Sequence, residues 1–164
     1  MSFQELSIPV GPSACRNAAT AKEAAFRVDY PLAAARNTRV LALDQGAERI
    51  VRPAAELAWE QAQFYSVSDP GHALITMTGE TVELDEALDG SNTVVMVSTD
   101  GSNGEAVATI GAACKVRGIM TAGLVVTPGT LTSDALSHLR PHARILLVPA
   151  EEDDLVELLR ATRA

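Results

Sequence analysis

Side chains able to do chemistry gather in one short stretch of the chain, residues 98–104, with the sequence STDGSNG. The run TVVMV precedes this stretch, and the alanine-rich segment EAVATIGAACKVRG follows it. A β-branched apolar run is typical of a strand and the following segment of a helix, so the stretch is expected to be a strand-to-helix turn. Free backbone N–H groups and the positive end of a helix dipole meet at such a turn, which favours phosphates and other oxygen-rich ligands.

The whole turn is a candidate ligand-binding loop. Its glycines permit positive φ or close backbone approach, and its hydroxyl and amide side chains are short and polar. The alternative is an ordinary tight turn in which Asn103 or Ser102 caps the following helix, and the sequence leaves both interpretations open. The residues predicted to bind a ligand are Ser98, Thr99, Asp100, Gly101, Ser102, Asn103 and Gly104, together with Asp44 from an earlier turn.

Acid/base candidates are few. His72 follows Pro70 and Gly71 and could reach the same edge of the sheet as the loop, and Glu105 begins the following helix. We therefore name Glu105 and His72 as the catalytic candidates. No nucleophile elbow, Walker A lysine or HExxH metal motif is present, and no metal site is predicted.

Four segments are expected at the edge where the strands end: residues 44–46, 68–69, 98–104 and 127–130. Ligands of open parallel sheets bind beyond this edge. Asp44, Asp69 and Asp100 would gather three carboxylates there, so a phosphate would need a divalent cation or a compensating arginine such as Arg49. The carboxylates could instead accept hydrogen bonds from a sugar or alcohol, or serve as turn formers and caps.

Alternating apolar and amphipathic segments predict an α/β class with a three-layer Rossmann-like fold and a mainly parallel sheet of about five strands. We expect one α/β domain over residues 39–164 and a partly helical N-terminal extension over residues 1–38. The expected strands are 39–43, 63–67, 72–77, 93–98, 119–126 and 144–149. The expected helices are 47–62, 81–90, 104–117, 132–139 and 151–163.

The bulk composition narrows the classes of partner. The chain has 164 residues, a net charge of −8 and two distant cysteines, Cys15 and Cys114. The charge argues against nucleic acid and anionic membranes, and the cysteine spacing argues against zinc. We predict a cytoplasmic protein without a cofactor that binds a small molecule, with a phosphorylated one among the candidates. We also predict a homo-oligomer, because the segment 105–117 is rich in alanine and residues 26–32 include apolar side chains without a place in the sheet core. The alternative is that the segment 18–35 packs against its own chain.

The loop resembles the signature of the sugar isomerase (SIS) domain, which is a strand, then Ser-x-Ser-Gly-x-Ser/Thr-x-Glu, then a helix. Ser98, Gly101 and Glu105 match this pattern, whereas Asp100 and Asn103 stand where the family has hydroxyls. The resemblance covers residues 39–126 and implies an α/β fold that binds a sugar phosphate or acts as an isomerase. The alternative function is a noncatalytic assembly or regulatory protein that keeps the fold without the activity.

A second resemblance is to the nucleotide domain of the tubulin/FtsZ family. That domain also sends a strand into a glycine-rich loop and a helix, followed by a strand that ends near Thr-Pro, as at Thr127 and Pro128 here. It implies a nucleotide-binding domain as a further alternative, although its glycine-rich signature is denser than DGSNG.

Overall fold

A computed structural model describes residues 35–68, 70–127 and 133–164 of the chain. Residues 1–34 lie outside the described part, so the partly helical extension over 1–38 and its boundary with the α/β domain stay predictions. Asp69 and residues 128–132 also lie outside it. In the part that is described, no helix is both long and apolar enough to cross a lipid bilayer.

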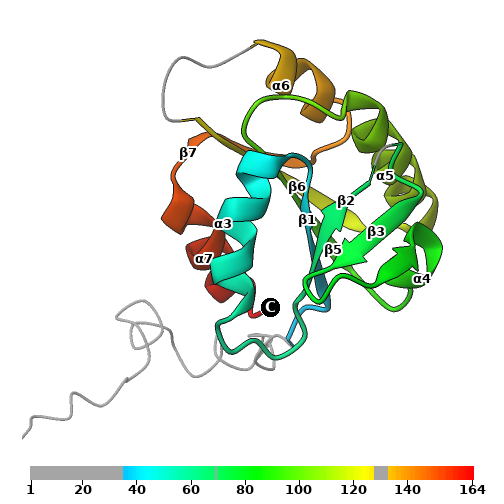
Figure 1. The fold of residues 1–164 in the computed structure, drawn as a ribbon, viewed down its shortest axis with the longest axis vertical. Coiled ribbons are helices and arrows are strands. Elements are labelled where there is room, and N and C mark those ends of the chain that lie inside the picture. Colours follow the sequence, from blue (N-terminus) through cyan, green and yellow to red (C-terminus); the bar gives the residue numbers. More distant parts are fainter. Residues whose placement is uncertain (1–34, 69, 128–132) are drawn as a thin grey trace, which may run out of the picture. The chain divides into compact units, whose positions relative to one another are not determined.

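The core is one seven-stranded sheet with the order β4-β3-β2-β1-β5-β6-β7 (Figure 1). Its five parallel strands confirm the predicted α/β class and mainly parallel sheet. The predicted number of about five strands is wrong, because two antiparallel strands extend the sheet beyond β2. The parallel strands are β1 (Thr38–Ala42), β2 (Gln63–Val67), β5 (Thr93–Ser98), β6 (Met120–Val126) and β7 (Ile145–Ala150).

The added strands form a hairpin of β3 (Ala73–Thr76) and β4 (Thr81–Glu83). Gly79 has a φ of +94°, and its N–H donates to the Thr76 carbonyl at 2.9 Å, which closes the turn. The helix predicted over 81–90 is therefore shorter: α4 spans only Leu84–Leu88. The β-branched residues Thr81 and Val82 pair with β3 before the helix begins, which fits their preference for strands.

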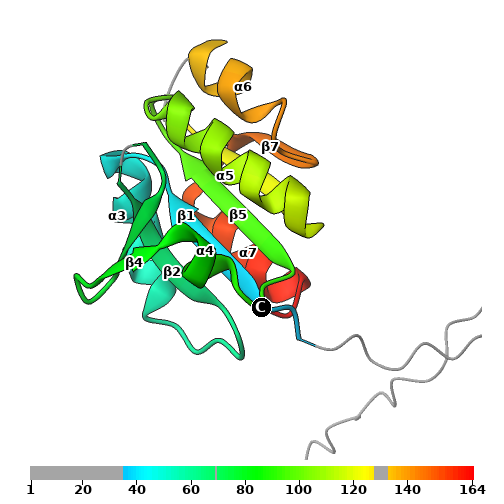
Figure 2. The same ribbon diagram turned by 90° about the vertical axis from the view of Figure 1, so that its right-hand side faces the viewer.

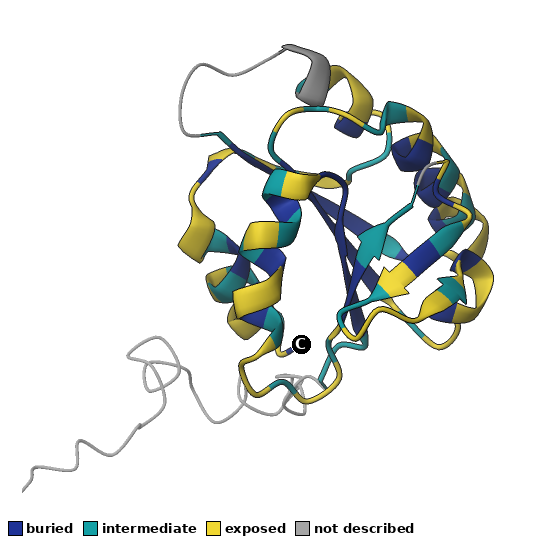
Figure 3. Ribbon diagram, in the orientation of Figure 1, coloured by how far each residue is buried: buried dark blue, intermediate teal, exposed yellow. Residues whose placement is uncertain are grey.

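Two helical layers cover the sheet (Figures 1 and 2). On one face, α3 (Gln45–Ala55) and α7 (Glu152–Ala161) pack over Val40, Val95 and Leu124. On the other face, α4, α5 (Gly104–Arg117) and α6 (Ser133–Leu139) pack over Leu41 and Met96. Alternate strand residues thus enter opposite core layers, as the two-residue period of a strand requires, and the buried residues concentrate on the central strands (Figure 3).

The helix boundaries follow local chemistry. The helix predicted over 47–62 is α3, which ends at Ala55. Pro53 therefore lies in the last turn of α3, and only two helical residues follow the position where proline lacks a backbone N–H. The helix predicted over 104–117 is α5, and Gly118 ends it with a φ of +67°.

The topology reverses between β1 and β5, which are neighbours in the middle of the sheet. The chain leaves β1 through α3 on one face and leaves β5 through α5 on the other. Counted along the chain, the parallel strands have the order 2-1-3-4-5, which is the flavodoxin-like order of doubly wound sheets. Such sheets bind ligands at the carboxyl ends of the strands beside this reversal.

Candidate functional site

Asp44 joins the ends of β1 and β5 at the point of reversal. Its side chain is 8% exposed. One carboxylate oxygen, Oδ1, accepts from the Ala47 N–H at 2.7 Å and from the Thr99 hydroxyl at 2.5 Å. The other, Oδ2, accepts from the Ser98 hydroxyl at 3.1 Å and from the N–H groups of Thr99 at 2.7 Å and Asp100 at 3.3 Å. Asp44 is therefore both the N-cap of α3 and the brace of the β5–α5 loop.

These hydrogen bonds also set the charge state of Asp44. Burial raises the pKa of a carboxyl, but the hydroxyl of Thr99 and the backbone N–H groups of Thr99, Ala47 and Asp100 stabilise the ionised form. The hydrogen bonds outweigh burial, and the pKa of Asp44 lies below its usual value. A carboxylate that already accepts five hydrogen bonds holds the turn together while it stays ionised.

The loop predicted to hold an anion uses much of its donor capacity within the chain. The N–H groups of Thr99 and Asp100 point to Asp44, that of Gly101 donates to the Ser98 hydroxyl at 3.2 Å, and that of Ser102 donates to Asp100 at 2.8 Å. The last of these bonds makes Asp100 a turn former. The predicted ligand contacts of residues 98–104 and of Asp44 stay predictions.

Two further features bind this loop to the start of α3 and the end of β1. Asn103 adopts a φ of +64°, and its side-chain amide donates to the Leu43 carbonyl. A Cβ at Gly46 would lie 3.0 Å from the Cβ of Thr99 and closer still to the Thr99 hydroxyl. Only glycine lets the two turns approach this closely, so the glycine is required by packing.

A cavity of about 560 Å³ lies beside this brace, beyond the carboxyl ends of β5, β6 and β7 and against the first half of α3. We call it the carboxyl-edge cavity. A smaller space of about 270 Å³ continues from it between α3 and α7, and the two share Arg49, Ile50 and Glu152. The carboxyl-edge cavity is lined by Gly46, Arg49, Ile50, Thr99, Val126, Thr127, Ala150, Glu151 and Glu152.

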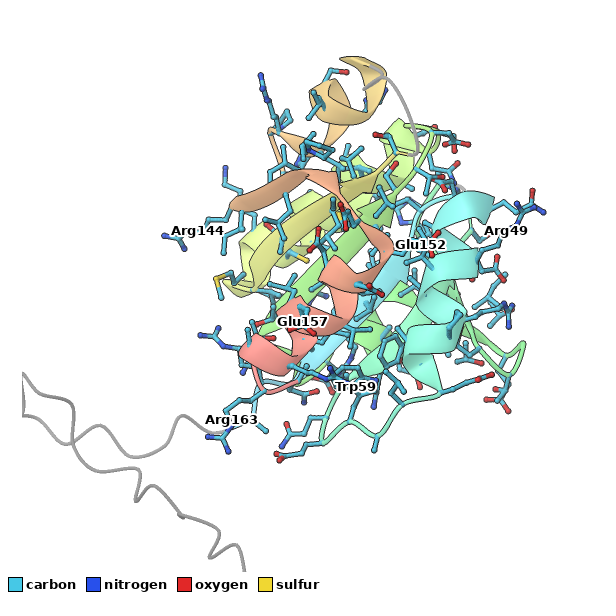
Figure 4. All side chains as sticks on the ribbon, turned by 90° about the vertical axis from the view of Figure 1, so that its left-hand side faces the viewer. Arg49, Trp59, Arg144, Glu152, Glu157 and Arg163 are labelled. Atoms are coloured by element: carbon cyan, nitrogen blue, oxygen red, sulfur yellow. The ribbon has the colours of Figure 1, made fainter. Side chains whose placement is uncertain are left out.

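The charged groups of this cavity come from two helices that face each other, with Arg49 on α3 and Glu152 at the start of α7 (Figure 4). The guanidinium of Arg49 is exposed and has no ion-pair partner in the described part of the chain. Glu151 accepts from the Asp154 N–H, and Asp154 accepts from the Glu151 N–H at 2.7 Å, in a capping box. The N-terminal donors of α7 are thus partly used by its own carboxylates, and Arg49 is the single cationic side chain among the described residues of the lining.

The structure brings only part of the predicted set to this cavity. Thr99 is the one residue of the 98–104 loop in its lining, and Arg49 joins it as the cation expected near the strand ends. Glu105 and His72 are exposed side chains outside the lining, so their catalytic roles stay predictions. Among residues 35–68, 70–127 and 133–164, no group of three His, Cys, Asp or Glu side chains is placed to hold a metal ion.

The contribution of β7 and α7 to the cavity was not predicted from the sequence. Ala150, Glu151 and Glu152 lie at the carboxyl end of a parallel strand, as the 98–104 loop does. The rule that ligands of parallel sheets bind beyond the carboxyl ends of the strands (the edge rule) could have included these residues, because they directly follow a strand predicted from residue 144 to 149.

Comparisons with known proteins do not assign the chain to a family. No protein-family model matches it, and no curated protein matches its sequence. Its solved structural neighbours include a flavoprotein from Lactobacillus acidophilus in complex with FMN, with 16% identity over 77% of this chain and 99% of that one and a TM-score of 0.44. They also include a putative pilus assembly-related protein from Burkholderia pseudomallei, with 16% identity over 83% and 98% and a TM-score of 0.42. At these TM-scores neither protein informs on the ligand or partner of this chain.

Proposed function

We propose that this α/β domain binds a small molecule in the carboxyl-edge cavity. The observation that carries the proposal is the position of the cavity, beyond the strand ends and beside the reversal between β1 and β5. Its volume of about 560 Å³ lies within the range of ordinary ligand sites. The Asp44 brace supports the proposal because it holds Thr99 and the start of α3, two walls of the cavity, in a fixed relation.

The lining favours a ligand with an anionic group and a polar, uncharged part. Arg49 offers an unpaired guanidinium, which forms bidentate hydrogen bonds with phosphates and carboxylates. Thr99 and Glu152 offer groups that accept from hydroxyls or amines, and Ile50 and Val126 give the site apolar walls. A sugar phosphate, as the SIS resemblance implies, and a mononucleotide both have this character.

Binding, rather than acid/base catalysis, is the activity we propose. The candidate acid and base, Glu105 and His72, lie outside the cavity lining. Asp44, which braces one wall of the cavity without lining it, is held ionised by five hydrogen bonds, so it is poorly suited to give or take a proton at neutral pH.

Isothermal titration calorimetry and thermal unfolding test the proposal with three probes: a sugar phosphate, a mononucleotide and inorganic phosphate, each with and without magnesium. A ligand present at one hundred times its dissociation constant stabilises the protein by about 2.7 kcal/mol. The R49Q variant is expected to weaken binding by roughly tenfold, because an ion-assisted hydrogen bond is lost.

The matched control is R52Q, which removes the same charge from the same helix outside the cavity lining, where Arg52 pairs with Glu48. Binding that is equal in R49Q and R52Q would place the ligand elsewhere. If none of the three probes changes the unfolding temperature of the protein, the result argues against this function.

A noncatalytic assembly or regulatory protein is the second candidate, and one observation favours it. Ile145 and Leu147, on the edge strand β7, are 46% and 37% exposed. In the sheet that the described residues form, β7 is the last strand, and exposed apolar side chains on the edge of a sheet are a common site of association. The predicted homo-oligomer is tested by sedimentation equilibrium of the full chain and of I145K/L147K: a dimer lost in the variant supports this candidate, and a monomeric full chain contradicts it.

A further inference from the structure

A second cavity lies at the opposite edge of the sheet, where β6 and β7 begin. It has a volume of about 410 Å³ and is walled by the end of α5 and by the turn that precedes β7. Among the described residues of its lining, three are basic, Lys115, His142 and Arg144, and none is Asp or Glu. We call it the basic cavity. Such a lining is unusual in a chain with a net charge of −8, because most of the surface repels anions.

The cationic side chains of Lys115 and Arg144 take part in no ion pair of the described residues. The ion pairs of the described residues join Arg52 to Glu48, Arg117 to Asp85 and Arg160 to Glu157, and none involves Lys115 or Arg144. Both side chains are exposed, and Arg144 projects from the start of β7, across the molecule from Arg49 (Figure 4). Two cations therefore face solvent at the mouth of the basic cavity, and no described residue of its lining carries a negative charge.

The turn before β7 is held in place by hydrogen bonds. The Thr121 hydroxyl donates to the His142 carbonyl at 2.5 Å, and the Arg144 N–H donates to the Thr121 carbonyl at 2.9 Å. The His142 N–H donates to the Leu139 carbonyl at 3.0 Å. A site whose backbone is already fixed loses little conformational entropy when a ligand binds.

His142 is positioned by a glycine of α5. A Cβ at Gly111 would lie 2.6 Å from Cγ of the His142 ring, so the ring packs directly on the helix backbone at this point. This contact explains a glycine in the middle of a helix, where it is otherwise unfavourable. It also sets the imidazole as one wall of the basic cavity, together with Lys115 of the same helix.

The end of α5 does not oppose an anion strongly. A helix C-terminus carries a partial negative charge on its free carbonyls. Here the Ile119 N–H donates to the Cys114 carbonyl at 2.9 Å and the Gly118 N–H to the Lys115 carbonyl at 3.3 Å, so two of these carbonyls are already paired. At physiological ionic strength charges more than about 8 Å away are largely screened, so the local cations outweigh the distant acidic surface.

We infer that the basic cavity binds a small phosphate-bearing anion through Lys115, His142 and Arg144. This site is separate from the carboxyl-edge cavity, because the two have no lining residue in common. The inference therefore does not depend on the proposed function.

The experiment titrates the full-length, ¹⁵N-labelled chain with pyrophosphate while sodium chloride keeps the ionic strength constant. Saturable shifts are expected at the amides of Gly118, Thr121, His142 and Arg144, with a dissociation constant of about 1 mM or below. K115Q/R144Q is expected to weaken this binding by roughly tenfold or more. The control R117Q/R160Q removes the same net charge from residues outside the lining and should change it by less than about twofold.

Each other outcome overturns the inference. Shifts that grow linearly without saturation, or equal weakening in K115Q/R144Q and R117Q/R160Q, would show general screening of charge. Saturable shifts confined to Gly46 and Thr99 would place the anion in the carboxyl-edge cavity, which supports the proposed function and rejects the basic cavity. R49Q separates the two sites further, because it should leave the shifts at Gly118 and Thr121 unchanged.

Discussion

Removing the carboxylate of Asp44 is expected to destabilise the protein by far more than the loss of a helix cap. The cap alone, the bond from the Ala47 N–H, is worth about 1 kcal/mol. D44A also leaves the Thr99 and Asp100 N–H groups without their acceptor, and an unsatisfied donor costs about 1–3 kcal/mol when it is buried. Both N–H groups are only part-buried, and the hydroxyls of Ser98 and Thr99 can rotate to other acceptors, so we expect a total loss near 3 kcal/mol.

Urea unfolding at pH 7, followed by circular dichroism, measures this loss. D85A is the control, because Asp85 is an exposed carboxylate in a surface ion pair with Arg117, and its removal should cost less than about 1 kcal/mol. T99V should cost about 1 kcal/mol alone and much less in the D44A background, because the hydroxyl then has no carboxylate to meet. A loss of 1 kcal/mol or less in D44A, or strictly additive effects of D44A and T99V, would refute the idea of a shared network.

The pH dependence follows from the depressed pKa of Asp44. The folded state favours the ionised carboxylate, so its contribution is fully present above the unfolded pKa of about 4 and is lost as pH falls through the folded value. The difference in stability between wild type and D44N is therefore expected to be constant from pH 7 to about pH 5 and to shrink below pH 4. A difference that grows on acidification would contradict this assignment.

Three further predictions concern residues outside this network. R39M should unfold at lower urea, with a loss of about 2 kcal/mol, because the buried Arg39 guanidinium donates to two carbonyls at the end of α4; a change below about 0.5 kcal/mol would reject that role. G111A should destabilise the wild type, whereas in an H142A background it should stabilise by up to about 1 kcal/mol, since the clash is gone and alanine favours a helix; the same sign in both backgrounds excludes the packing explanation. Burial raises the pKa of the Cys114 thiol to about 11, so in a C15S variant a thiol reagent at pH 8 should react only after urea unfolds the chain, and fast labelling of the folded protein would contradict this.

Local sequence patterns were enough to predict most parallel strands and α5. The run at residues 93–98 has no charged residue, and the structure confirms it as the interior strand β5 with these bounds. The hairpin strand β4 was missed because it has only three residues and continues directly into α4, so its pattern merges with that of a helix. Gly79 was the available signal, since a glycine between two β-branched segments is typical of a hairpin turn.

The candidate site was predictable only in part, because its residues come together from distant segments. The edge rule identified Asp44 and the 98–104 loop, but it could not show that they would hydrogen bond to each other. Arg49 was expected near the strand ends and does line the cavity, whereas the facing wall from α7 depends on how two helices pack. The alanine-rich segment 105–117 suggested contact with another subunit. At Gly111 of this segment the structure places the His142 ring of the same chain, and the homo-oligomer itself stays a prediction.

If the carboxyl-edge cavity is a small-molecule site, a fragment screen by ¹H–¹⁵N NMR on the full chain detects binding there without knowledge of the natural ligand. Fragments are expected to shift the amides of Gly46, Thr99 and Ala150, and I50W, which fills the cavity from α3, should abolish these shifts. V116W is the control, because it introduces the same side chain at an exposed position of α5 outside the cavity lining. Fragment hits that avoid these amides, or that persist unchanged in I50W, would contradict a small-molecule site in this cavity.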